Sequence, residues 1–303
     1  METTSYQELI DSRPKYNTML ERLSIKPKNN RWDEAYKLVT ELERNRLNDN
    51  PEEIDGKLLG RMRFALTDLS NLNLILDQFE DEESEVFKEK FNEMLSGSID
   101  QTEETKTASK SRDTQFELLM CARFREVGLV SSLGKIHPDV VVVVDGIKYG
   151  FECKRIFNFN EHSVQNNIEK AINQLYKNFI NKDYRNRGMP LICIDRYITG
   201  GNTILTVQNA DSARSELGRQ IQVFVDKYYK RWNAEKAKDS RIIGAVLYMN
   251  ITAILRDEEM PVVCQQFGIS NNGWAGVSKE MFDDFVRDIG QLLGPIDTSK
   301  VNS

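Results

Sequence analysis

The stretch HPDVVVVVDGIKYGFECKR, residues 137–155, constrains the fold of this chain more than any other segment. Five consecutive valines are followed by Asp145-Gly146 and then by a second apolar-rich run. Asp-Gly between two strand-forming runs is typical of a β-hairpin with a two-residue turn. The sequence therefore predicts two antiparallel strands joined at this dipeptide.

The turn also sets the register of the two strands. Val144 should face Ile147, which places Asp139 opposite Glu152 on one side of the hairpin, with Lys154 on the same side because side chains alternate along a strand. The opposite side is apolar and should face the core: it carries Val140, Val142, Val144, Ile147, Tyr149, Phe151 and Cys153.

Two carboxylates that face each other across a hairpin repel, so a fold without a use for them should avoid the pair. A divalent cation removes the repulsion, because Mg²⁺ is commonly held by one or two carboxylates together with water and phosphate oxygens. Such an ion polarises a phosphoryl oxygen and activates a bound water. A neighbouring lysine can position that water or offset the developing charge. Asp139, Glu152 and Lys154 are therefore candidates for a metal-dependent hydrolytic site.

Pro138-Asp139 followed by Glu152-x-Lys154 on the next strand resembles the motif of the PD-(D/E)xK, or restriction-endonuclease-like, nuclease superfamily. The resemblance covers about residues 113–255. It implies that Asp139 and Glu152 bind the metal and that Lys154 assists the attacking water. It also implies an α/β fold, a restriction-endonuclease-like mixed β-sheet core flanked by helices. The alternative interpretation is a hairpin with a surface ion pair between Glu152 and Lys154.

An amphipathic helix predicted over residues 114–127 precedes the hairpin. In the resembled superfamily such a helix often supplies a further glutamate near the metal, and Glu117 is the matching position. The resemblance thus adds Glu117 to the catalytic and metal-binding candidates. A glutamate on the helix face, paired with Arg112 or Arg123, remains the open alternative.

The segments on either side of this region suggest two domains. The apolar periodicity of residues 1–96 predicts an all-helical accessory domain, with helices over 32–47, 58–79 and 82–95. Residues 97–112 contain one large apolar residue and predict a linker or exposed loop. The resemblance implies that residues 113–303 form a nuclease-like domain.

Alternating helices and strands are predicted after the hairpin. Helices are expected over 163–181, 211–237 and 281–293, and buried strands over Pro190–Ile198 and Ile242–Ile251. In the first helix, Gln174 is a weak candidate for the active site, and a solvated polar face with Lys170 and Lys177 is the favoured interpretation. The basic tail after Asp226 contains aromatic residues, and there an amphipathic helix is favoured over a nucleic-acid contact.

Composition excludes several classes of site and segment. The net charge of −6 is concentrated in residues 1–112, so the rest of the chain is close to neutral. The four cysteines are far apart and fit buried thiols in a reducing cytoplasm. No apolar run is long enough to span a membrane, and the beginning of the chain lacks a signal-peptide core. With only His137 and His162 in the chain, a site built on histidines is poorly supported.

The sequence therefore predicts a cytoplasmic, Mg²⁺-dependent nuclease, with Mn²⁺ as a substitute, that hydrolyses phosphodiester bonds in DNA. By analogy with the superfamily, a restriction or phage-defence effector is expected. The rivals are a nuclease acting on RNA and a non-catalytic nucleic-acid-binding or assembly module that retains the fold. Homodimerisation and a protein partner for the helical region are left open.

Overall fold

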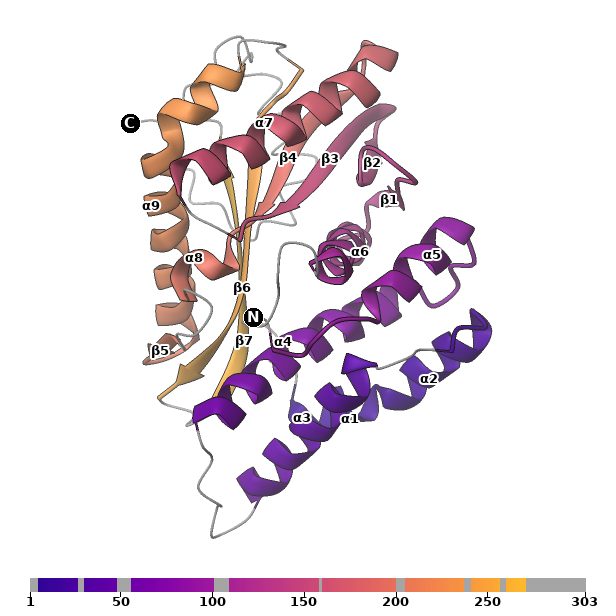
Figure 1. Ribbon diagram of the computed structural model, residues 1–303, viewed down its shortest axis with the longest axis vertical. Helices are drawn as coiled ribbons and strands as arrows, with labels where there is room; N and C mark the ends of the chain where they lie inside the picture. The colour runs from indigo at the N-terminus through magenta and orange to yellow at the C-terminus, as the bar shows by residue number, and fades with distance from the viewer. Residues whose placement is uncertain are drawn as a thin grey trace. The chain divides into compact units, whose positions relative to one another are not determined.

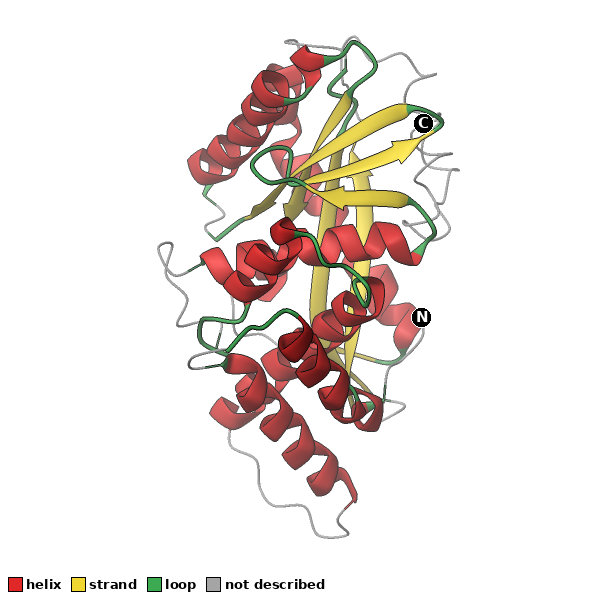
Figure 2. Cartoon of the chain, turned by 90° about the vertical axis from the view of Figure 1, so that its right-hand side faces the viewer, coloured by secondary structure: helices red, strands yellow, loops and turns green. Residues whose placement is uncertain are grey.

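The computed structural model describes residues 5–26, 30–47, 56–100, 109–157, 160–199, 205–236, 241–256 and 260–270; the remainder is grey in Figure 2. These residues form a mixed α/β structure, which confirms the predicted class. The chain divides into two compact units. Unit 1 is Met1–Ala122, Asp195–Ser215 and Asn250–Cys264; unit 2 is Arg123–Ile194, Glu216–Met249 and Gln265–Ser303.

The helices of unit 1 agree with the periodicity of the sequence. They are α1 (Tyr6–Asp11), α2 (Arg13–Arg22), α3 (Arg31–Leu47), α4 (Gly56–Gln78), α5 (Glu85–Met94) and the first part of α6 (Lys110–Glu126). The N-termini of α1 and α5 are fixed by serine caps. The Ser5 side chain accepts a hydrogen bond from the Glu8 N–H, and the Ser84 side chain accepts one from the Phe87 N–H. None of the described helices is both long and apolar enough to cross a membrane.

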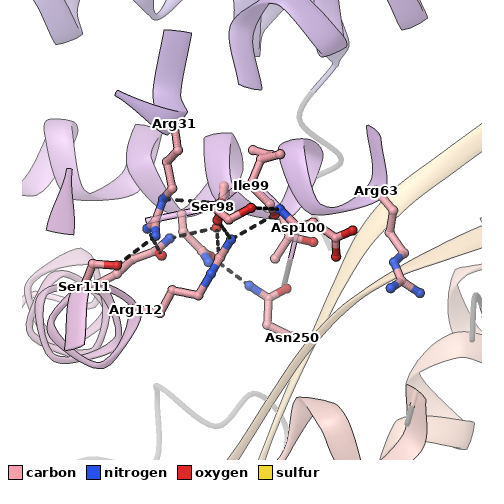
Figure 3. Close-up of polar contacts among 12 residues, drawn as sticks. Arg31, Arg63, Ser98, Ile99, Asp100, Ser111, Arg112 and Asn250 are labelled. Atoms are coloured by element: carbon pink, nitrogen blue, oxygen red, sulfur yellow. Dashed lines mark hydrogen bonds and ion pairs between the residues drawn. The ribbon is translucent and has the colours of Figure 1, made fainter. Parts of the chain in front are cut away.

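A buried ionic network joins three of these helices (Figure 3). The Asp68 carboxylate of α4 accepts from Arg112 Nη1 of α6 at 2.8 Å and lies 3.6 Å from Arg31 Nε of α3. Arg112 Nη2 also donates to the carbonyls of Ser98 and Ile99, both at 3.0 Å. All three charged side chains are at most 4% exposed, so the Asp68 carboxylate offsets part of the positive charge of the two arginines inside the unit.

The same network bears on the predicted linker at residues 97–112. Its first residues are held by Arg112, and its last residues already belong to α6, which begins at Lys110 rather than at Thr114. Residues 101–108 lie outside the described part of the chain. The predicted division into domains at this segment stays a prediction.

Unit 1 also contains a small β-sheet region. The short strand β5 (Leu205–Val207) runs parallel to the second half of β6 (Ala245–Leu255). Two polar contacts connect this half of β6 to α4: Asn250 Nδ2 donates to Asn71 Oδ1 at 2.8 Å, and the hydroxyls of Thr67 and Thr252 are 3.0 Å apart. Residues separated by about 180 positions thus meet inside one unit.

The strand predicted over Pro190–Ile198 extends too far, since the observed strand ends at Cys193. Strand β4 spans Arg187–Cys193, and Asp195–Thr199 forms the short helix α8. The Asp195 carboxylate accepts from the backbone N–H of Asn250 at 2.6 Å, a contact that a strand continuing in register would not make.

The sheet of unit 2 has the order β1-β2-β3-β4-β6, with β1 (Val130–Leu133), β2 (Val140–Val144) and β3 (Ile147–Arg155). Strands β1 to β3 are antiparallel, whereas β3, β4 and β6 are parallel. The predicted hairpin register is confirmed, since Val144 pairs with Ile147 and Val140 with Phe151. Asp145 and Gly146 both have positive φ, as the tightest hairpin turns require.

Helices cover both faces of the β2–β3 hairpin. On the apolar face, the ring of Phe124 of α6 packs against that of Phe151 at a tilt of 36°, with ring centroids 4.7 Å apart. On the other face, α7 (Glu161–Asn178) lies along β3 and β4 (Figure 1) and continues into the 3₁₀ turn η2 (Ile180–Lys182). The buried residues of α7 are Val164, Ile168, Ala171, Ile172 and Leu175, which confirms the predicted stripe. The face that carries the candidate site is therefore enclosed.

The last described elements are α9 (Ala210–Lys236) and β7 (Met260–Ser270), which pairs with β6. Tyr228 of α9 is 1% exposed and packs on Phe224, so its ring is not a surface for stacking bases. The side chains of the basic tail from residue 229 onward and the helix predicted over 281–293 lie outside the described residues. All four cysteines are buried thiols, as predicted.

Candidate metal centre

Asp139 is the last residue of the turn between β1 and β2, directly before the first residue of the hairpin. The ladder between β2 and β3 ends at the pair Val140–Phe151, one position short of the expected pairing with Glu152. Asp139 instead directs its carboxylate at β3, where Oδ2 accepts from the Cys153 N–H at 2.8 Å. Asp139 is 5% and Glu152 0% exposed, so both carboxylates are enclosed on the face that the sequence predicted.

His137 completes a group that the sequence interpretation did not identify. Its Nδ1 lies 3.0 Å from Glu152 Oε1 and 4.0 Å from Asp139 Oδ1. One ligand atom from each of these three residues can be chosen so that all lie within 4.8 Å of one another. Two carboxylates and an imidazole are a donor set that fits a divalent cation.

Lys154 supplies the positive charge of the centre. Its Nζ donates to Glu152 Oε1 at 2.7 Å. Burial alone would lower the pKa of the Lys154 ammonium, but the Glu152 and Asp139 carboxylates outweigh it and raise the pKa. Because Glu152 is fully buried, the pair is not the surface ion pair of the alternative interpretation.

Gln174 extends the centre from the covering helix α7. Its Nε2 lies 3.0 Å from His137 Nε2, so the amide contacts the ring nitrogen that faces away from the carboxylates. Its Oε1 is buried and has no hydrogen-bond partner in the part of the chain that the structure describes. Lys170 and Lys177 are exposed, as a solvated face predicts, whereas Gln174 departs from that prediction.

Glu117 has a different environment. Its carboxylate forms an ion pair with Lys90 of α5, inside unit 1. The arginines considered as its partners are bonded elsewhere: Arg112 to Asp68, and Arg123 to Glu126 at 2.6 Å. Glu117 is outside the group of three potential ligands found among the described residues, and its metal-binding role stays a prediction.

Gly134 allows the turn that positions His137 and Asp139. Its N–H donates to the Asp139 carbonyl at 2.8 Å, and a Cβ at this position would lie 1.8 Å from the Pro138 carbonyl oxygen. The backbone of the turn can take this path only while residue 134 lacks a side chain.

Gly134→Ala is therefore expected to displace Pro138 and Asp139 and to lower the free energy of unfolding by about 1–3 kcal/mol, as overpacking does. Gly218→Ala on α9 is the control, because a Cβ there meets nothing within 4 Å. Urea denaturation of both variants measures the difference. A Gly134→Ala protein as stable as the control would show that the turn does not depend on this close approach.

No protein-family model, curated protein or solved structure matches this chain.

Proposed function

We propose that the chain is a metal-dependent nuclease whose centre consists of Asp139, Glu152 and Lys154. The observation that carries this proposal is the convergence of two enclosed carboxylates, an imidazole and an ammonium at the end of one hairpin. After α6 the order is β1, the β2–β3 hairpin, α7, β4, α8, β5, α9 and β6, which contains the expected succession of hairpin, helix, strand, helix and strand and supports a restriction-endonuclease-like core.

Electrostatics argues for a bound cation. When ionised, Asp139 and Glu152 bring two negative charges into an enclosed space, where the Lys154 ammonium bonds to Glu152. Excess buried charge is costly unless another charge balances it. A bound divalent ion would supply that balance, and it would also polarise a phosphoryl oxygen and activate water for attack.

Each residue then has a distinct part in phosphodiester hydrolysis. Asp139 and Glu152 hold the ion, and the Cys153 N–H fixes the orientation of Asp139. The ammonium of Lys154 orients the attacking water and offsets charge that develops on the phosphate. Mg²⁺ is the expected cofactor, with Mn²⁺ as a substitute. DNA is the proposed substrate, and a restriction or phage-defence role remains an analogy with the resembled superfamily.

The test is a cleavage assay with supercoiled plasmid, linear duplex, single-stranded DNA and RNA, each with Mg²⁺, Mn²⁺ or EDTA. We expect cleavage of DNA that requires the ion and disappears in Asp139→Asn. Asp139→Asn, purified in the same way, is the control for cleavage that does not come from this site, because it keeps the size of the side chain and removes its charge.

Other outcomes would redirect the proposal. Cleavage that persists in EDTA would show that the reaction does not need the ion, and full cleavage by folded Asp139→Asn would remove Asp139 from the mechanism. Cleavage of RNA alone would favour the ribonuclease alternative. Binding of nucleic acid without cleavage under any condition would favour the non-catalytic module.

A further inference from the structure

His137 presents a ring nitrogen to both carboxylates. Its Nδ1 is 3.0 Å from Oε1 and 3.2 Å from Oε2 of Glu152, and the side chain is 26% exposed. Without an ion, an Nδ1–H that donates to Glu152 accounts for this contact. With an ion, the same nitrogen can bind it only if the proton is on Nε2. The tautomer of the ring therefore decides whether the centre has two protein ligands or three.

The tautomer depends on what Nε2 contacts, and that contact is the amide of Gln174. An amide can present its NH₂ group, which donates to an unprotonated Nε2, or its oxygen, which accepts from Nε2–H. Rotating the amide by half a turn exchanges the two. Because Oε1 has no hydrogen-bond partner among the described residues, the rotation breaks none of their bonds to that oxygen and gives it one.

From this geometry we propose that His137 binds the ion directly through Nδ1 and that Gln174 selects the tautomer which makes this possible. A residue behind a histidine ligand commonly fixes the tautomer in this way. Gln174 is thus a positioning residue, since it acts through His137. The inference refines the cofactor of the proposed nuclease and rests on that proposal only for the role of the ion in cleavage.

A nitrogen ligand changes which ion the centre prefers. Mg²⁺ favours oxygen ligands and dehydrates reluctantly, whereas imidazole raises the affinity for first-row transition ions. The centre should therefore select a transition ion over Mg²⁺. Mn²⁺ is the suitable probe, because it accepts both carboxylate and imidazole ligands.

The experiment is isothermal titration of the full chain with MnCl₂ and, separately, MgCl₂, in the absence of nucleic acid. We expect wild type to bind Mn²⁺ at least about tenfold more tightly than Mg²⁺. His137→Ala should weaken Mn²⁺ binding about 10–100-fold, the range typical when a residue that supports metal binding is lost. The same substitution should change the affinity for Mg²⁺ much less. His162→Ala is the matched control, because the other histidine is exposed and bonded to Asn166.

Substitutions of Gln174 separate positioning from packing. Gln174→Leu should lower the ratio of Mn²⁺ to Mg²⁺ affinity, because it cannot accept from Nε2–H. Gln174→Glu should preserve that ratio, since a carboxylate accepts. Gln165→Leu on the same helix is the control, because Gln165 is bonded to Glu169. Equal ratios in Gln174→Leu and wild type would overturn the role of Gln174.

Pulsed electron paramagnetic resonance of bound Mn²⁺ gives a readout that does not depend on affinity. Coupling to imidazole nitrogen should be present in wild type and in His162→Ala and absent in His137→Ala. Nitrogen coupling that survives in His137→Ala, or is missing from wild type with Mn²⁺ bound, would overturn the inference. In that case Mn²⁺ binding that is lost in Asp139→Asn would leave the proposed nuclease standing. A wild type that binds neither ion would refute both.

Discussion

Lys154→Ala is expected to lower the rate of metal-dependent cleavage by about two to four orders of magnitude, the range typical of a positioned group that assists proton transfer. Lys154 Nζ is held 2.7 Å from Glu152 Oε1 and is mostly enclosed, so solvent cannot substitute for its donors and charge. Single-turnover cleavage of the preferred substrate measures the effect.

The ion should still bind to this variant, because the substitution removes a positive charge beside the carboxylates and leaves the ligands in place. Lys148→Ala is the matched control: Lys148 is on the same strand and the same side of the hairpin but is exposed near the turn. Loss of cleavage of the same size in Lys148→Ala, or full activity in Lys154→Ala, would assign Lys154 no part in catalysis.

Asp68→Ala is expected to lower the free energy of unfolding by about 3–5 kcal/mol, the usual cost of removing one partner from a buried ion pair. The substitution leaves Arg31 and Arg112 in a space where both are at most 4% exposed. Urea denaturation followed by intrinsic fluorescence measures the change. Asp77→Ala on the same helix removes the exposed pair with Lys15 and should cost less than about 1 kcal/mol.

The contribution of Asp68 should also depend on pH. Burial alone would raise the pKa of this carboxyl, but Arg112 and Arg31 outweigh it and lower the pKa. A depressed pKa in the folded state gives stability that is fully present above the unfolded pKa of about 4 and is lost as pH falls through the folded pKa. The difference between wild type and Asp68→Ala should therefore shrink in acid. A difference that stays constant would mean that charge is not what Asp68 contributes.

Short sequence patterns correctly predicted the elements whose structure depends on neighbouring residues in the chain. Asp145-Gly146 fixed the register of the hairpin, and this register placed Asp139 and Glu152 on one side. Helices with a strong apolar stripe, such as α4 and α7, were also predicted to within a few residues. The four-residue strand β1 was not predicted, because a run as short as Val-Ser-Ser-Leu has no periodicity to distinguish it from a loop.

Contacts between distant segments could not be predicted in this way. The scarcity of histidines counted against a histidine ligand, so His137 was not predicted to join the two carboxylates. Gln174 looked like part of a solvated face, because periodicity does not reveal which polar position of a helix lies over a neighbouring side chain. The burial of Arg31 and Arg112 was not predicted either. A charged side chain is expected at the surface unless its buried partner is known, and the sequence does not show that partner.

The contacts between α4 and β6 have a consequence for synthesis of the chain on the ribosome. Asn71 and Thr67 are made about 180 residues before Asn250 and Thr252, the partners that satisfy them inside unit 1. At about 5–20 residues per second, this interval lasts roughly ten seconds or more. Throughout it, Asn71 and Thr67 lack these two partners, so this part of unit 1 can be completed only after residue 252 has been made.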